Sequence, residues 1–235
     1  MKGVTYFVHV YYPGSWKLIT DKCGWLFSEA DNIVVSACHD DVIAEIRSSG
    51  FNLIIQKVTN KGKDIGGKLA GISYYNRFLQ PSEYLAFLHD KISPQTLNPE
   101  YWFDQLYDIF SKEKFEKALE VLKKGRVGLA GSKGFLRNEW SAAKRSFNTT
   151  NDSILRELLS RYELVPSAYD YIGGTVFITR HDAFADFFRL NDPFSVRENL
   201  EEGNVLDLDE GTYTHSWERL LCLIPQAKGF KIAGI

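Results

Sequence analysis

Patterns that form disulfides are missing from this chain. Its 235 residues include 3 cysteines, 7 prolines and 1 methionine. Cys23, Cys38 and Cys222 lie far apart and are odd in number, so neither a disulfide framework nor a zinc-binding spacing follows from them. We therefore expect buried thiols in a reducing cytoplasm.

A transmembrane segment and a charge bias are missing too. No apolar run approaches the roughly 20 residues that span a bilayer, so any membrane contact is expected to be peripheral. Residues 1–5 lead straight into an expected strand without a signal-peptide pattern, which agrees with a cytoplasmic location. The formal net charge of −2 gives no sign of a nucleic-acid partner.

Aromatic residues, by contrast, are plentiful. The 16 Phe, 12 Tyr and 5 Trp supply a large core and leave rings for binding surfaces. The sequence has no internal repeat and no linker rich in Pro, Gly or Ser. We expect a single domain, residues 1–235, with two lobes.

The order of the expected elements predicts an α/β fold. Apolar, β-branched runs at 6–12, 32–38, 51–58 and 84–88 are typical of buried strands, and helical stretches separate them. This alternation is typical of a mostly parallel sheet. In the less regular second half we expect helices at 99–124 (broken near Ser111), 152–162, 181–190 and 212–224, strands at 127–131 and 173–180, and a polar loop at 132–151.

The strongest functional signal is a glycine-rich segment, residues 60–68, between the third strand and an expected helix at 69–79. Gly62, Gly66 and Gly67 would let backbone N–H groups approach a ligand. The helix would turn its positive N-terminal end toward an anion. The alternative is a surface turn whose glycines only shape the chain.

Polar side chains meet at the carboxyl ends of the expected strands, where α/β sheets bind ligands. Asn60 and Asp64 suit hydroxyls or a base edge, and Lys63 suits a phosphate. As alternatives, Asp64 caps the helix and Lys63 is a solvated charge. His9 and Tyr11 share one face of the first strand and would stack a base, although Tyr11 also fits a core role. The pattern favours a phosphate-bearing ligand.

Several motifs, in their order, resemble the rhamnan synthesis F family of bacterial and viral polysaccharide glycosyltransferases. The matching pieces are His9-Val10-Tyr11-Tyr12, Asn60-Lys61-Gly62-Lys63-Asp64-Ile65-Gly66, Leu88-His89-Asp90-Lys91-Ile92-Ser93, Gly174-Thr175-Val176-Phe177 and Gly211-Thr212-Tyr213-Thr214-His215-Ser216-Trp217-Glu218-Arg219. The resemblance implies a GT-A-like glycosyltransferase with a mixed central sheet. Its Rossmann-like half, residues 1–95, would bind a nucleotide-sugar, and residues 96–235 would bind the acceptor.

The resemblance also implies the ligands. The donor would be a UDP- or dTDP-sugar, with rhamnose suggested by the family name, and the acceptor a growing or lipid-linked glycan. A GT-A enzyme neutralises its leaving diphosphate with Mn²⁺ or Mg²⁺, usually after the fourth strand. His89 and Asp90 occupy that place, and Asp90 stands where the family usually has threonine. The alternative is a polar pair that caps the next segment.

Candidate catalytic residues lie in the second half. His215 and Glu218 are three apart on an expected helix and hence neighbours. Glu218 would take the proton of the acceptor hydroxyl, or else form an ion pair that orders the helix. Asp170 is a competing base. We interpret Asp207 and Asp209, an Asp-x-Asp pair, as part of a solvated turn.

Two other classes of function could share an α/β fold of this kind. A non-catalytic module that binds a nucleotide or glycan with the same fold remains the alternative. An NAD-dependent oxidoreductase is not expected, because the glycine-rich segment follows the third strand and lacks the Gly-x-Gly-x-x-Gly spacing.

Overall fold

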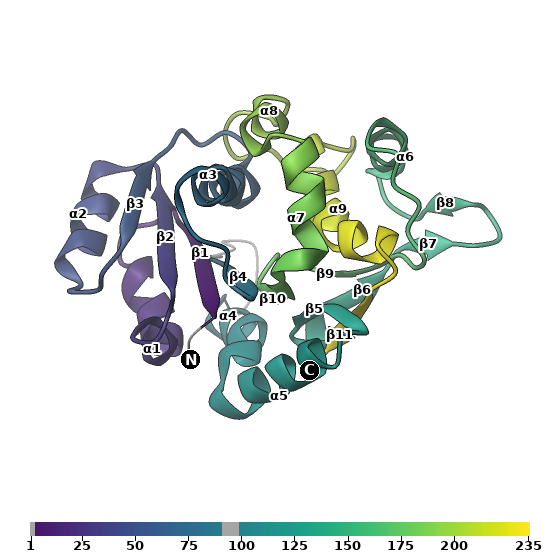
Figure 1. Ribbon diagram of the computed structural model, residues 1–235. Helices are drawn as coiled ribbons and strands as arrows, with labels where there is room; N and C mark the ends of the chain where they lie inside the picture. Colours follow the sequence, from purple (N-terminus) through teal and green to yellow (C-terminus); the bar gives the residue numbers. More distant parts are fainter. Residues whose placement is uncertain (1–2, 91–98) are drawn as a thin grey trace.

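The computed structural model describes residues 3–90 and 99–235, and a seven-stranded sheet forms its centre (Figure 1). The strand order is β11-β5-β10-β4-β1-β2-β3. β10 is antiparallel to β4 and β5, and the other neighbours are parallel. The expected α/β fold with a mixed, mostly parallel sheet is confirmed. The strands are β1 (Val4–Val10), β2 (Asn32–Ala37), β3 (Ile54–Lys57), β4 (Tyr84–His89), β5 (Val127–Gly131), β10 (Phe177–Arg180) and β11 (Lys231–Gly234).

Helices cover both faces of this sheet (Figure 1). α3 and α7 pack on the face that carries Phe7 and Phe87, and α1 packs against Tyr6 on the other face. The helices are α1 (Ser15–Phe27), α2 (Asp40–Ser48), α3 (Lys63–Phe78), α4 (Pro99–Tyr107), α5 (Lys112–Lys123), α6 (Asp152–Arg161), α7 (His181–Leu190), α8 (Pro193–Glu198) and α9 (Tyr213–Ala227). Alternate residues of β1 thus serve two separate helix–sheet interfaces, which explains why the whole strand is buried.

Small elements lie between the main ones. The strand pairs are β6 (Leu136–Asn138) with β9 (Asp170–Ile172), and β7 (Trp140–Ser141) with β8 (Ser146–Phe147). Short 3₁₀ turns are η1 (Asp108–Phe110) and η2 (Lys133–Phe135). The expected polar loop at 132–151 therefore contains three short strands, and η1 separates α4 from α5 near the expected break.

The start of α3 differs from the expectation. The helix begins at Lys63, so Gly66 and Gly67 lie inside its first turns rather than in a loop before it. Gly62 precedes it with a φ of 73°, a left-handed conformation that favours glycine. The third strand is also shorter than expected, because only Ile54–Lys57 pair with β2.

Both parts of the chain contribute to the one central sheet. β10 pairs with β4, so residues after 96 continue the sheet that residues before 90 begin. The division near residue 95 falls outside the described residues and stays a prediction, as does the part of the fourth-strand motif from Lys91 to Ser93.

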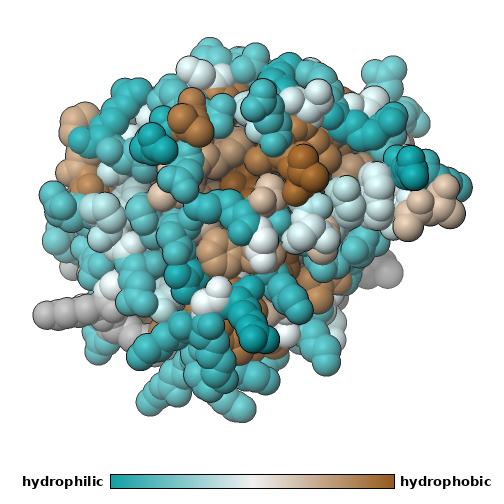
Figure 2. Space-filling model, turned by 45° about the vertical axis from the view of Figure 1, so that its right-hand side comes forward, coloured by the Kyte–Doolittle hydropathy of each residue, from teal (hydrophilic) through white to brown (hydrophobic). Residues whose placement is uncertain are grey.

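The surface shown in Figure 2 is mostly polar, with small scattered hydrophobic areas. In the two described ranges, no helix has the length and apolar character that crossing a bilayer requires.

Candidate functional site

A small cavity of about 40 Å³ lies between the start of α3 and the start of α9, beside the turn that enters β10. Its lining residues are Lys63, Asp64, Ile65, Gly174, Thr175, Thr214, His215 and Glu218. The structure thus brings predicted residues of the glycine-rich segment and of the last helix to one cavity. The two helices start at Lys63 and Tyr213, 150 positions apart in the sequence (213 − 63).

Asp64 presents an ionised carboxylate to this cavity. Its Oδ2 accepts hydrogen bonds from Lys68 Nζ at 2.8 Å and Thr175 Oγ1 at 2.6 Å. Burial raises the pKa of Asp64, but His89 and Lys68 lower it more, so the net pKa lies well below its usual range. The side chain is 20% exposed. A fixed carboxylate at a cavity wall suits the hydroxyl groups of a sugar or ribose.

The Gly174–Thr175 turn holds several of these groups together. His89 Nε2 lies 2.6 Å from the carbonyl oxygen of Gly174 and 3.7 Å from Asp64 Oδ2. The N–H of Gly174 donates to Glu218 Oε1. Lys68 Nζ donates to the carbonyl oxygen of Thr175 at 2.9 Å. One short turn therefore sets the positions of both carboxylates of the cavity.

Glu218 is also part of an ionic cluster behind the cavity. Its Oε2 lies 3.6 Å from Arg219 Nη1, while Arg219 Nε donates to Glu139 Oε2 at 2.8 Å. Tyr171 donates to the same Glu139 carboxylate at 2.6 Å. The ion pair that is the alternative role of Glu218 is thus present, and Glu218 also lines the cavity.

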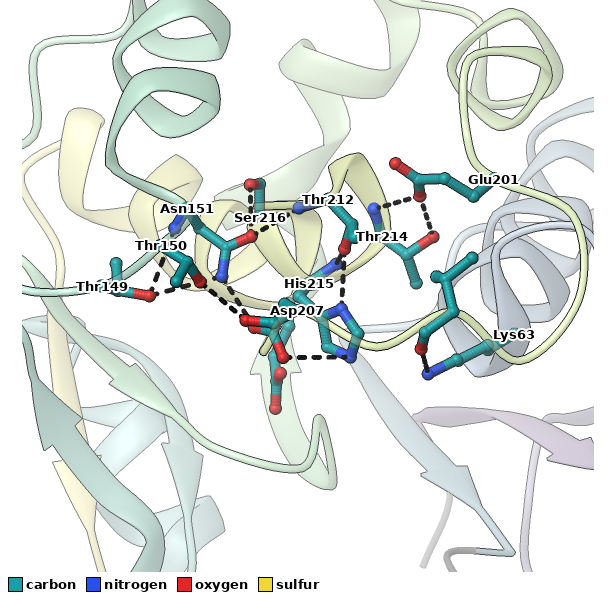
Figure 3. Close-up of polar contacts among 12 residues, drawn as sticks. Lys63, Thr149, Thr150, Asn151, Glu201, Asp207, Thr212, Thr214, His215 and Ser216 are labelled. Atoms are coloured by element: carbon teal, nitrogen blue, oxygen red, sulfur yellow. Dashed lines mark hydrogen bonds and ion pairs between the residues drawn. The ribbon is translucent and has the colours of Figure 1, made fainter. Parts of the chain in front are cut away.

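His215 is held by groups from two sides (Figure 3). Its Nδ1 lies 2.7 Å from Thr212 Oγ1, and its Nε2 lies 3.9 Å from Asp207 Oδ1. Asp207 Oδ2 accepts a hydrogen bond from Asn151 Nδ2 at 2.8 Å. Asp207 is therefore a partly buried, bonded side chain, which corrects our interpretation of it as part of a solvated turn; Asp209 is exposed, as expected.

The glycines of the segment lie against protein atoms. A Cβ on Gly67 would meet His9 Nδ1 at 2.1 Å, and one on Gly66 would meet the carbonyl oxygen of Lys61 at 1.7 Å. The N–H of Gly62 donates to the carbonyl oxygen of Glu201 at 2.8 Å. The structure thus shows a packing role for these glycines, and their contact with a donor stays a prediction.

Three other predicted donor residues, His9, Tyr11 and Asn60, do not line the cavity. His9 is buried, its Nδ1 lies 2.9 Å from Ser36 Oγ, and burial lowers its pKa to about 4. Asn60 Nδ2 donates to Asn204 Oδ1 at 3.2 Å. Tyr11 follows the last residue of β1 and packs against the rings of Tyr12 and His39.

Asp170, the competing base, lies on β9 away from the cavity lining. Its Oδ1 accepts a hydrogen bond from Asn138 Nδ2 at 2.9 Å. Its place in the structure favours Glu218 as the candidate base.

His89 and Asp90 do not fit joint ligation of one cation. His89 Nε2 bonds the Gly174 carbonyl oxygen, whereas Asp90 Oδ2 accepts the N–H groups of Tyr11 at 2.7 Å and Tyr12 at 2.6 Å. Consecutive residues at a strand end face opposite sides of a sheet. Among the described residues, no group of three or more His, Cys, Asp or Glu side chains is placed to hold a metal ion.

Sequence reasoning gave no role to Thr175 and Thr212, set Asp207 aside, and placed Lys68 in the glycine-rich segment without predicting its bond to Asp64. The spacing of Asp64 and Lys68, four apart on a helix, is a signal for a pair. Thr175 and Asp207 come close to these residues only through the tertiary fold, so no local pattern indicates them.

Comparisons with known proteins give structural likeness alone. No family model matches the sequence, and no curated protein matches it. Among solved structures, a mycobacterial protein has a TM-score of 0.37 and 13% identity over 78% of this chain, which spans about half (54%) of that protein.

A synthase and a synthetase are also similar in structure. 4-Diphosphocytidyl-2C-methyl-D-erythritol synthase from Anaerococcus prevotii has a TM-score of 0.44 and 12% identity, and the match covers 100% of this chain and 86% of the synthase. CMP:2-keto-3-deoxy-manno-octonic acid synthetase has a TM-score of 0.40 and 9% identity, and the match covers 83% of this chain and 82% of that enzyme. Likeness at these TM-scores carries no argument about ligand or activity, and the α/β fold rests on the strand order itself.

Proposed function

We propose that this protein is a glycosyltransferase that moves a sugar from a nucleotide-sugar to a glycan acceptor. The observation that carries the proposal is the cavity between α3 and α9, where a fixed carboxylate, Asp64, and a candidate base, Glu218, line one space. The resemblance of the motifs supports a polysaccharide acceptor, and rhamnose from a dTDP donor is the finer proposal.

The residues divide by role in this proposal. Asp64 accepts hydrogen bonds from donor hydroxyls, and Lys63, on the same wall, places a positive charge near the phosphates. Glu218 accepts the proton of the acceptor hydroxyl as that oxygen bonds to the anomeric carbon. The bond from this carbon to the phosphate oxygen breaks, and the nucleoside diphosphate leaves with the electron pair.

A divalent cation, Mn²⁺ or Mg²⁺, stays a prediction from the resemblance. It would neutralise the leaving diphosphate. Because His89 and Asp90 bond to different backbone groups, we route no step through it.

A non-catalytic binding module is the second candidate, and one observation favours it. Both oxygens of Glu218 already have neighbours, the Gly174 N–H and the Arg219 guanidinium. A glutamate held in this way serves the scaffold as readily as it serves as a base.

One experiment separates the two functions. The protein is incubated with a panel of UDP- and dTDP-sugars plus Mn²⁺ or Mg²⁺, with and without glycan acceptors, and released nucleoside diphosphate is measured. Transfer by the wild type is expected, with donor affinity in calorimetry reduced by about 1–3 kcal/mol in Asp64→Ala. Asp209→Asn, an exposed acid, is the control. Donor binding without release or transfer would establish the binding module instead.

A further inference from the structure

The segment of residues 201–209, which we call the strap, crosses from the start of α3 to the start of α9. Burial alternates along its first part, with Glu201, Gly203, Val205 and Asp207 facing inward and their neighbours outward. The path bends at Gly203, whose φ of 75° lies in the left-handed region. The strap has the side chains of Glu201, Val205 and Asp207 partly buried, while its other residues are exposed or, at Gly203, lack a side chain.

Hydrogen bonds fasten the strap to α3. The N–H of Gly203 donates to the carbonyl oxygen of Asn60 at 2.8 Å, and the Glu201 carbonyl oxygen accepts the N–H of Gly62. Lys63 Nζ donates to the carbonyl oxygen of Val205 (Figure 3). These contacts fix the register of the strap beside the cavity.

The strap is also bonded to α9 and α6. The Glu201 carboxylate accepts the N–H groups of Tyr213 at 2.6 Å and Thr214 at 2.9 Å, which are otherwise unsatisfied at a helix start. At its other end, Asp207 Oδ2 is bonded to Asn151, and its carbonyl oxygen accepts from Thr150 Oγ1 at 2.8 Å (Figure 3). Asp207 Oδ1 is thereby directed toward His215.

The contacts of His215 are compatible with a hydroxyl proton donated to Nδ1. Thr212 Oγ1 accepts the backbone N–H of His215 at 3.2 Å, so its own proton is available for Nδ1, 2.7 Å away. In that arrangement the ring proton of the neutral imidazole would be on Nε2, which faces Asp207 Oδ1 at 3.9 Å. An added proton on Nδ1 would place a full positive charge opposite this carboxylate.

We propose that Asp207 is a positioning residue for His215, holding the imidazole in the cavity with its proton on Nε2 and favouring the protonated ring. The proposal rests on the proposed function for its consequence, because a charged imidazole in this cavity lies where a sugar or phosphate group of the donor would bind. Asp207 does not touch the ligand; it acts through His215.

Other charged groups around His215 shape the same titration. Lys63, Asp64 and Glu218 line the cavity with it, and Arg219 Nη1 donates to its carbonyl oxygen at 3.0 Å. Asp207 differs from these carboxylates in facing Nε2 from the strap. Replacing Asp207 therefore tests its effect on His215 separately from the effects of the cavity carboxylates.

The test is an NMR titration of the histidine rings in the intact protein. The chain has 5 histidines, so the signals of His215 are assigned by difference from His215→Gln. We expect the Nε2–H tautomer above the midpoint. Asp207→Asn is expected to lower the midpoint by roughly half to one pH unit, and Asp209→Asn, the same charge change at an exposed strap position, by about 0.2 or less.

An Nδ1–H tautomer in the wild type, or equal shifts in the two variants, would overturn the proposal. The titration needs no turnover, so a protein that transfers no sugar would remove the proposed function and leave this assignment intact. Where transfer is measured, the pH profile of kcat/KM should move with the midpoint in Asp207→Asn. A merely structural Asp207 would lower Tm and leave the midpoint of His215 where it was.

Discussion

A buried lysine–carboxylate pair is the main charged feature at the scale of single residues. Lys68 is 1% exposed, and its ammonium group bonds to Asp64 and to both oxygens of Thr175. Such a pair contributes little net stability, yet losing one partner is costly because the other charge stays buried. The pair therefore holds Asp64 in one position and one charge state beside the cavity.

Replacing Lys68 should show this asymmetry. Lys68→Met is expected to lower the free energy of unfolding by about 3–5 kcal/mol, because Asp64 loses its cation. Adding Asp64→Asn should restore part of this loss, since the uncompensated charge is gone. Urea unfolding of both single variants and the double variant measures the coupling, and strictly additive losses would show that the pair is not coupled.

His9 should make the free energy of unfolding depend on pH. Burial lowers its pKa from 6.5 to about 4, so between these values the unfolded chain binds the proton and the folded chain does not. Stability is therefore full above pH 6.5 and falls as pH drops toward 4, by up to roughly 3 kcal/mol. In His9→Asn, urea midpoints should decline less over this range. An unchanged decline would mean that other groups cause it.

At the scale of elements, the approach of α3 to the sheet depends on glycine. Gly67 faces β1 and β2, where a Cβ would meet His9 Nδ1 at 2.1 Å and Ser36 Oγ at 2.6 Å. Gly71, one turn later, faces Phe7 at 2.9 Å in the same way. The helix can therefore lie close enough for Asp64 and Lys68 to reach the turn before β10.

Alanine at position 67 should weaken the packing of α3 on the sheet. Gly67→Ala is expected to destabilise the protein by about 1–3 kcal/mol, because overpacking forces a shift despite the better helix propensity of alanine. Gly134→Ala is the matched control, since its Cβ would have no atom within 4 Å, and a change within about 0.5 kcal/mol is expected. Equal thermal melting curves for the two variants would contradict this packing role.

At the scale of the whole molecule, the site joins the two parts of the chain. α3 follows the parallel strands of the first part, α9 belongs to the second, and the antiparallel β10 between β4 and β5 brings the Gly174 turn to both. Glu218 is anchored to that turn, so its proposed role tests the arrangement as a whole.

The Glu218→Gln variant should distinguish a catalytic role of Glu218 from a structural one. The amide keeps an oxygen for the Gly174 N–H but cannot take a proton, so turnover is expected to fall roughly 10²–10⁴-fold with donor affinity unchanged. Transfer rate, calorimetry and Tm are measured on one preparation. If the variant melts early and its folded fraction transfers sugar normally, Glu218 is a scaffold residue.

The sequence alone determined the α/β class, most helices and the residues of the glycine-rich segment. These follow from local patterns, because hydrophobic periodicity reports which face of each element is buried. The helix at His181–Leu190 matches its expected range, whereas α3 begins six residues before the expected Leu69 (69 − 63), since glycines that read as a loop were instead packing contacts.

Only the tertiary structure decided which polar residues share a site. It placed Lys63, Asp64, His215 and Glu218 around one cavity, left Asp170 elsewhere, and gave His89 and Asp90 separate backbone partners. It also turned Asp207 toward His215. Such contacts depend on strand order and on the path of the strap, and neither leaves a repeating pattern in the residues that make them.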